Sequence, residues 1–137
     1  MYPEHLTAPM AQQLNDYGFK SLRTPTEVDE VLSQKEGTTL VVVNSVCGCA
    51  AGYARPGAIA AVQGDKKPDN LVTVFAGVDR EATQRAREFF VPYPPSSPSM
   101  ALFKDGKLVH FIERYHIEGS NAEMIAANLK MAFDRFC

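Results

Sequence analysis

The feature that most constrains how this chain can fold is a strand-to-helix junction that carries two cysteines. The apolar run Leu40–Val43 predicts a buried strand, and Tyr53–Gln63 predicts a helix. The residues that open the junction are Asn44, Ser45, Val46, Cys47, Gly48 and Cys49. Unpaired N–H groups and the dipole at a helix N-terminus favour the thiolate form of cysteine, which attacks disulfides and binds metals. The junction therefore indicates thiol–disulfide chemistry, with metal binding as the rival interpretation.

Length and composition limit the domain count, the partners and the location that this chain can have. The 137 residues and their ordinary composition indicate one globular domain, residues 1–137. A formal net charge of -2 without a basic cluster argues against a nucleic-acid partner. No apolar run approaches the ~20 residues of a membrane span, and the N-terminal residues lack the pattern of a signal peptide, so we expect no membrane partner and a cytoplasmic location. Three cysteines in such a compartment favour catalysis or metal binding over a disulfide scaffold.

Capping residues and apolar spacing predict five helices. They cover residues 7–18, 25–36, 53–63, 80–90 and 121–136. The first lies in an appended segment, residues 1–18, and its apolar stripe consists of Leu6, Met10, Leu14 and Tyr17. The predicted caps of later helices are Thr24 with Glu27, Asp79, and Ser120 with Glu123. Pro56 and Gly57 predict a kink in the helix that follows the cysteines.

The predicted strands cover residues 19–23, 38–44, 71–78, 99–104 and 107–115. The β-branched residues of the second strand indicate burial on both of its faces. Asp105-Gly106 predicts a tight hairpin between the last two strands. Together these elements predict an α/β fold, a mixed central sheet of four to five strands with helices on both faces and an extra N-terminal helix.

This arrangement resembles the thioredoxin fold at two separated places. One is the cysteine pair at the junction, and the other is Pro98, which is followed by an apolar strand and the turn Asp105-Gly106. In thioredoxin-like proteins a cis proline begins that strand, so the resemblance predicts a cis Ser97–Pro98 bond facing Cys47. The motif differs from that of thioredoxin, because a single residue, Gly48, separates the two thiols.

The context of the cysteines resembles that of the bacilliredoxin family over nearly the whole chain. The shared features are the Cys-Gly-Cys motif, the Ala-Arg-Pro at residues 54–56 and the Thr-Pro-Thr-Glu-Val-Asp at residues 24–29. The resemblance implies removal of bacillithiol, or another low-molecular-weight thiol, from S-thiolated client proteins in the bacterial cytoplasm, with some disulfide isomerase activity. It implies that Cys47 is the attacking thiolate and Cys49 the resolving thiol, and that the small thiol is a co-substrate with no cofactor besides it.

The resemblance also assigns the substrate groove. We expect Gly48, Ser97 and Pro98 to contact substrate, with main-chain groups beside Pro98 pairing with an extended client segment. Arg55 is either a solvated helix residue or a group that stabilises the thiolate. Thioredoxins keep a buried aspartate in the strand before the cysteines, but Leu40–Val43 offers none, so no proton-transfer base is assigned.

Two alternative functions remain open from the sequence. A thiolate site for zinc or copper would draw on a small pool of ligands, with a partner subunit able to supply more. That pool is Cys47, Cys49, Cys137, His5, His110 and His116. We expect no metal, because no second cysteine pair is present, and we expect His110 to pack in the sheet, His116 to lie in a surface loop and Cys137 to be an exposed thiol without a role. The other alternative is a non-catalytic binding module on the same fold.

Overall fold

A five-stranded mixed sheet forms the centre of the molecule in the computed structural model, which describes residues 2–137. Its strands are β1 (Lys20–Ser21), β2 (Thr38–Asn44), β3 (Asn70–Phe75), β4 (Ser99–Lys104) and β5 (Lys107–Ile112). The spatial order is β1-β3-β2-β4-β5. β1, β3 and β2 run parallel, whereas β4 is antiparallel to β2 and β5 is antiparallel to β4. The predicted mixed sheet is confirmed.

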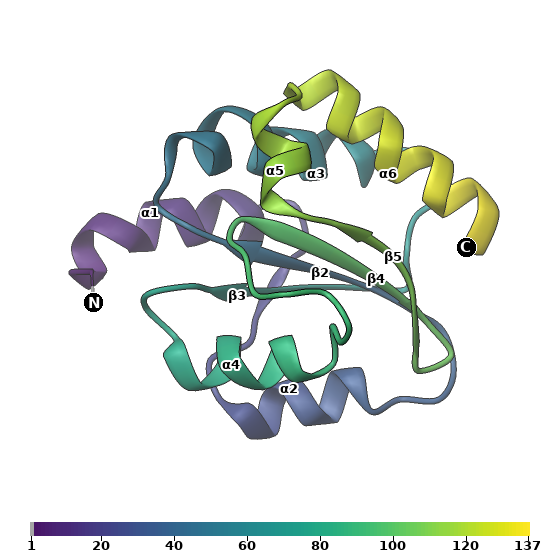
Figure 1. Cartoon of the computed structure of the whole chain (residues 1–137), viewed down its shortest axis with the longest axis horizontal. Coiled ribbons are helices and arrows are strands. Elements are labelled where there is room, and N and C mark those ends of the chain that lie inside the picture. The colour runs from purple at the N-terminus through teal and green to yellow at the C-terminus, as the bar shows by residue number, and fades with distance from the viewer. Residues whose placement is uncertain (1) are drawn as a thin grey trace.

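Helices cover both faces of this sheet (Figure 1). They are α1 (Glu4–Asn15), α2 (Pro25–Leu32), the π-helix η1 (Ala50–Ala54), α3 (Arg55–Ala61), α4 (Arg80–Glu88), α5 (Arg114–Glu118) and α6 (Ala122–Phe136). One hydrophobic cluster joins α2 and α4 to one face, and a second joins α1, α3, α5 and α6 to the other. No helix within residues 2–137 combines the length and apolar character needed to cross a membrane.

Strand β2 lies in the middle of the sheet, and all seven of its residues are buried. Leu40 and Val42 belong to the cluster beneath α3 and α6, while Val41 and Val43 belong to the cluster beneath α2 and α4. This alternation follows from the two-residue period of a strand, and it explains why both faces need β-branched or aliphatic residues. The central strand therefore fixes where its last residue, Asn44, and the cysteines after it must lie.

The N-terminal helix differs from the prediction in its start and in its buried face. α1 begins at Glu4 rather than Thr7 and contains Pro9, which removes a single main-chain hydrogen bond in the exposed second turn. Thr7 and Leu14 are buried, whereas Leu6 and Tyr17 are each 48% exposed. The predicted stripe was therefore wrong at both ends, because the helix turns a small polar residue toward the end of the sheet.

Two strands end earlier than predicted. β3 ends at Phe75 because the N–H groups of Val78 and Asp79 bond back to the Phe75 carbonyl, and Gly77 adopts a φ of 86° in this turn. β5 ends at Ile112, and the short helix α5 follows where the prediction extended the strand to residue 115.

The predicted cap at Thr24 and the predicted hairpin turn are confirmed. Asp79 precedes α4 as predicted, but its side chain forms no capping hydrogen bond, and a third cap is displaced. Thr24 accepts a hydrogen bond from the N–H of Glu27, and the hairpin at Asp105-Gly106 has φ angles of 52° and 81°. The predicted second helix ends at Leu32 rather than residue 36. The last helix is capped by Asn121, whose side chain accepts from the N–H of Met124, so the predicted cap at Ser120 was wrong by one residue.

Candidate active site

The cysteine pair lies where the chain leaves the end of β2. Helical structure begins at Gly48, five residues before the predicted Tyr53, so the pair opens the helix rather than preceding it. Cys47 and Cys49 are joined by a disulfide with a Cα–Cα distance of 5.5 Å. Both cysteines are half-buried, and Gly48 between them is exposed, with open space where a Cβ would lie.

A π-turn takes the place of the predicted kink after the cysteines. Residues Ala50–Ala54 form the π-helix, and the N–H of Arg55 donates to the carbonyl of Ala50, five residues earlier. Pro56 has no N–H, so the α-helical bond from this residue to Gly52 cannot form. The extra residue in the turn changes the direction in which the following side chains point, and it precedes the residue that enters the site, Arg55.

The two sulfur atoms have different surroundings. The N–H of Cys49 donates to Cys47 Sγ at 3.3 Å, and the N–H of Cys47 donates to Ser45 Oγ at 3.2 Å. Cys49 instead packs against the hydrophobic cluster beneath α3 and α6. A main-chain N–H at a helix N-terminus stabilises negative charge, so the position of Cys47 Sγ favours the thiolate.

Arg55 is buried beside this turn, with a residue exposure of 3%. Its Nε donates to Gln13 Oε1 at 2.8 Å, and its Nη1 donates to Asn44 Oδ1 and to the Ser45 carbonyl, both at 2.9 Å. All three acceptors are uncharged, and no carboxylate within residues 2–137 pairs with this guanidinium. Burial lowers the pKa of Arg55. The interpretation of Arg55 as a solvated helix residue was therefore wrong.

Asn44 links the buried guanidinium to both the cysteine turn and the N-terminal helix. Its Oδ1 accepts from Arg55 and also from the N–H of Ser45 at 2.9 Å, while its Nδ2 donates to the Met10 carbonyl at 3.2 Å. Gln13 and Met10 both lie on α1, so the appended helix completes this network. No role was predicted for Gln13 or for the side chain of Asn44, although a single amide at the end of a β-branched strand indicates a polar contact for the latter.

The segment before Pro98 reaches the same end of the sheet from β4. Ser99 lies opposite Val43 in the β2–β4 ladder, and the Ser97–Pro98 peptide bond is cis, as is the Val91–Pro92 bond. Pro98 is buried, whereas Ser97 is half-buried.

Two arginines donate to the carbonyl groups of this segment. Arg114 Nη1 bonds Ser97 O at 2.9 Å, and Arg87 Nη2 bonds Ser96 O at 3.4 Å. Burial lowers the pKa of Arg87. No role was predicted for Arg114, because the predicted strand ended at residue 115 and included Arg114, and no helix was predicted over residues 114–118.

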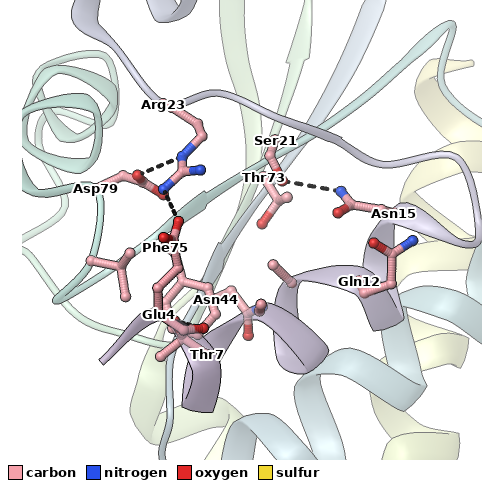
Figure 2. A pocket seen from close by; sticks show the side chains of 13 residues that line it. Glu4, Thr7, Gln12, Asn15, Ser21, Arg23, Asn44, Thr73, Phe75 and Asp79 are labelled. Carbon is pink, nitrogen blue, oxygen red and sulfur yellow. Dashed lines mark hydrogen bonds and ion pairs between the residues drawn. The ribbon is translucent and has the colours of Figure 1, made fainter. Parts of the chain in front are cut away.

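A cavity of about 250 Å³ lies beneath α1, next to this network. Figure 2 shows Asn44 on its wall, together with Thr7 and Gln12 from α1. Arg23 closes the other side through ion pairs with Glu4 and Asp79. The cysteines are not part of its lining, so the cavity adjoins the site without containing the reacting sulfurs.

The remaining candidate ligands are spread over the fold. His110 Nε2 lies 2.6 Å from Asn128 Oδ1 of α6 and is half-buried at the sheet. His116 lies in α5, not in a surface loop, and its Nδ1 accepts from the N–H of Glu113. Cys137 is an exposed free cysteine at the end of α6. Within residues 2–137, no group of three or more His, Cys, Asp or Glu side chains is arranged to hold a metal ion.

Comparison with known proteins gives close relatives and a shared fold. The family model described as "Disulphide isomerase" matches residues 2–137. A bacilliredoxin of Cytophaga hutchinsonii is 58% identical over 134 residues, covering 98% of this chain and 98% of the relative. A bacilliredoxin of Halalkalibacterium halodurans is 54% identical over 136 residues, covering 99% of this chain and 94% of the relative.

Solved structures extend the comparison to more distant proteins. A reduced thioredoxin of Schistosoma mansoni superposes with a TM-score of 0.59 at 15% identity, covering 87% of this chain and 98% of that one. A thioredoxin of Fasciola hepatica gives a TM-score of 0.58 at 18% identity, covering 87% of this chain and 100% of that one. At these identities the similarity concerns the fold, and the chain has the thioredoxin fold, as predicted.

Proposed function

The chain belongs to the bacilliredoxin family, and from this membership we propose that it removes bacillithiol, or another low-molecular-weight thiol, from mixed disulfides with client proteins. Its general class is that of a thiol–disulfide oxidoreductase. The observation that supports the assignment of roles is the hydrogen bond from the N–H of Cys49 to Cys47 Sγ, because it gives the two sulfur atoms unequal surroundings. Cys47 is the nucleophile and Cys49 the resolving thiol.

The first step transfers the small thiol from the client to the protein. The thiolate of Cys47 attacks the sulfur of the small thiol, and a new disulfide forms between them while the client disulfide breaks. The client leaves as a thiolate and takes a proton from water. No electrons are gained or lost overall, because one disulfide replaces another.

The second step releases the small thiol. Cys49, after losing its proton, attacks Cys47 Sγ, which yields the Cys47–Cys49 disulfide and the free small thiol. A second small thiol can attack the adduct instead, which yields a small-thiol disulfide and restores the Cys47 thiolate. The protein disulfide of the first route returns to the dithiol through exchange with an external thiol reductant.

The polar network around Arg55 supports a stable thiolate at Cys47. The guanidinium donates to the Ser45 carbonyl, and the side chain of Ser45 accepts from the N–H of Cys47. Arg55 therefore acts on the turn that carries the sulfur, as a positioning residue with a positive charge, without a direct bond to the sulfur. A buried cation without a carboxylate partner favours a nearby anion, and the thiolate is the anion that reduction creates.

The proposal includes the setting of the reaction. We place it in the cytoplasm, where small thiols keep most protein thiols reduced. Rearrangement of client disulfides is a further activity of the same pair, since a client that remains bonded to Cys47 can exchange again before Cys49 resolves it. Gly48 leaves the approach to the sulfurs open in this scheme.

Mass spectrometry of trapped intermediates tests the assignment. A client peptide in mixed disulfide with bacillithiol is incubated with the reduced protein and with Cys47→Ser, Cys49→Ser and Cys137→Ser variants. We expect the Cys49→Ser variant to retain one bacillithiol adduct on Cys47, the Cys47→Ser variant to release no peptide, and the Cys137→Ser variant to match the wild type.

Two outcomes would contradict the proposal. Trapping of the client peptide, rather than the small thiol, on Cys47 would mean that the protein attacks the opposite sulfur of the disulfide. An adduct on Cys49 in the Cys47→Ser variant, formed at the wild-type rate, would reverse the two roles.

A further inference from the structure

The main chain just before Pro98 is the edge that an extended substrate would meet beside the cysteines. β4 pairs with β2 from Ser99 onward, so Ser97 stands outside the ladder. It lies at the end of the sheet where β2 leads into Cys47. An added peptide strand binds through free main-chain N–H and C=O groups at such an edge. The state of these two groups in Ser97 therefore decides whether a polypeptide can pair here.

The carbonyl of Ser97 already has a strong donor. Arg114 Nη1 donates to it at 2.9 Å, and the N–H of Arg114 donates to Ser96 Oγ at 3.3 Å. The Nε of the same guanidinium forms an ion pair with Glu118 one turn later, so the group is held from two sides. Within residues 2–137, the N–H of Ser97 donates to no main-chain acceptor. The N–H of Ser97 is thus free to pair with a strand, whereas its carbonyl already accepts one hydrogen bond from a charged group.

We propose that Arg114 makes the thiol pair prefer mixed disulfides with small thiols over disulfides between polypeptides, an inference that rests on the thiol exchange proposed above for Cys47. A strand N–H approaching Ser97 O would share this oxygen with a charged guanidinium that already donates to it, and the positive guanidinium repels the partial positive charge on the approaching hydrogen. Helix α5, which carries Arg114, lies against the π-helix that follows the cysteines, so this guanidinium belongs to the same wall of the site.

The two substrate types differ in what must lie along Ser97. When Cys47 attacks a disulfide between two peptides, one peptide becomes bonded to Cys47 Sγ and the other leaves as a thiolate. The bonded peptide then runs past Ser97, and one of its N–H groups needs the Ser97 carbonyl as its acceptor. When Cys47 attacks the small-thiol sulfur of a mixed disulfide, the peptide is the leaving group, and the adduct has no extended main chain to pair. Arg114 therefore penalises the first reaction and leaves the second unaffected.

A ratio of two exchange rates tests this selectivity with the reduced full chain. Both substrates use one short peptide with a single cysteine, either as its disulfide dimer or in mixed disulfide with bacillithiol. We expect Arg114→Ala to raise kcat/KM for the peptide dimer by roughly 3- to 10-fold, the effect of one net hydrogen bond, with no change for the mixed disulfide. Arg114→Lys should restore the wild-type ratio, because its ammonium can donate to Ser97 O. Arg135→Ala, an exposed arginine of α6, is the matched control.

Each other outcome has a definite meaning. If Arg114→Ala lowers both rates by the same factor, or leaves their ratio unchanged, Arg114 has only a structural role and the inference fails. If the wild type acts on neither substrate, the proposed thiol exchange fails instead. Should Arg114→Ala not unfold cooperatively, Arg114→Met provides the second variant. It keeps an unbranched side chain of similar length but removes the donor to Ser97 O, so it should raise the ratio of the peptide-dimer rate to the mixed-disulfide rate as Arg114→Ala does, and an unchanged ratio would again overturn the inference.

Discussion

A cysteine lies near each end of β2, and the two ends differ in their electrostatics. At the C-terminal end, Cys47 Sγ accepts an N–H where a helix begins. At the N-terminal end, Cys137 caps the end of α6 and its thiol lies beside Thr38, the first residue of β2. A helix carries a partial positive charge at its N-terminus and a partial negative charge at its C-terminus. The first position therefore favours a thiolate, and the second opposes it.

The surroundings of the two thiols also differ. Loss of hydration is the largest effect on Cys137 and raises the pKa of its thiol. The carboxylate of Asp69 raises this pKa further, whereas the hydrogen bond with Thr38 and the charges of Lys104 and Lys66 lower it. Near Cys47 the buried charge is the guanidinium of Arg55, with uncharged acceptors only. The comparison teaches that exposure alone does not make a cysteine reactive, because the more exposed residue, Cys137, is the one with the raised pKa.

Replacing each of the two thiols in turn should give the largest difference in exchange rate between the two ends of β2. We expect Cys47→Ser to reduce exchange with a mixed disulfide to the uncatalysed rate, because serine provides no thiolate at neutral pH. Cys137→Ser should keep the wild-type rate. Release of a chromophoric small thiol from its mixed disulfide measures both. A comparable loss in the two variants would show that the ends of β2 do not differ in function.

Replacing the buried cation, Arg55, should show how much its charge contributes to the low pKa expected of Cys47. Arg55→Met removes a positive charge near the thiolate, so the pKa of Cys47 should rise by on the order of one unit. The pH dependence of iodoacetamide alkylation reports this pKa in a background that carries Cys49→Ser and Cys137→Ser. Arg135→Met, an exposed arginine on α6, is the control and should leave the alkylation midpoint in place. An identical midpoint in the two variants would limit Arg55 to a packing role.

The contribution of α1 should be smaller and should appear in stability. Gln13→Ala leaves the Arg55 Nε–H without its acceptor, which should lower the free energy of unfolding by about 1 kcal/mol. Gln12→Ala is the matched control, since among residues 2–137 its amide bonds the exposed Asp16, which caps the C-terminal end of α1, and no group of the Arg55 network. Urea unfolding of both reduced proteins measures the difference. Equal losses would mean that the appended helix does not support the site through Gln13.

The smallest expected effect concerns Cys137 and pH. A thiol whose pKa is raised in the folded state stays protonated while the unfolded chain loses its proton, so stability falls as pH rises through the ordinary thiol pKa of about 8.5. The wild type should therefore lose slightly more stability than Cys137→Ser between about pH 7 and about pH 10. Urea unfolding midpoints of both proteins, measured under reductant at the two pH values, test whether the wild type loses more stability than the variant. A larger loss in the serine variant would mean that the folded environment favours the thiolate after all.

Local patterns in the sequence predicted the parts of the fold that depend on neighbouring residues. The β-branched run gave the exact bounds of β2, Thr38–Asn44, and Asp105-Gly106 marked the hairpin. The spacing of Cys47 and Cys49 after that strand identified the candidate site. These signals work because strand period, turn conformation and helix initiation are set by a few adjacent residues. The helix α5 was not predicted, because its five residues, Arg114–Glu118, are too few to show a helical spacing of apolar residues, and Arg114 and Tyr115 closely follow the apolar run of β5.

Contacts between distant segments decided the rest. Gln13 and Arg55 are 42 positions apart, yet they meet because α1 packs beside the end of the sheet. Arg114 and Ser97 are 17 positions apart and meet because α5 turns back over the β4 end. A polar side chain in the sequence has no fixed partner, since the partner is chosen by which elements pack together. The sequence by itself therefore determined the thiols and the strand that presents them, and only the tertiary structure determined the charges and hydrogen bonds that surround them.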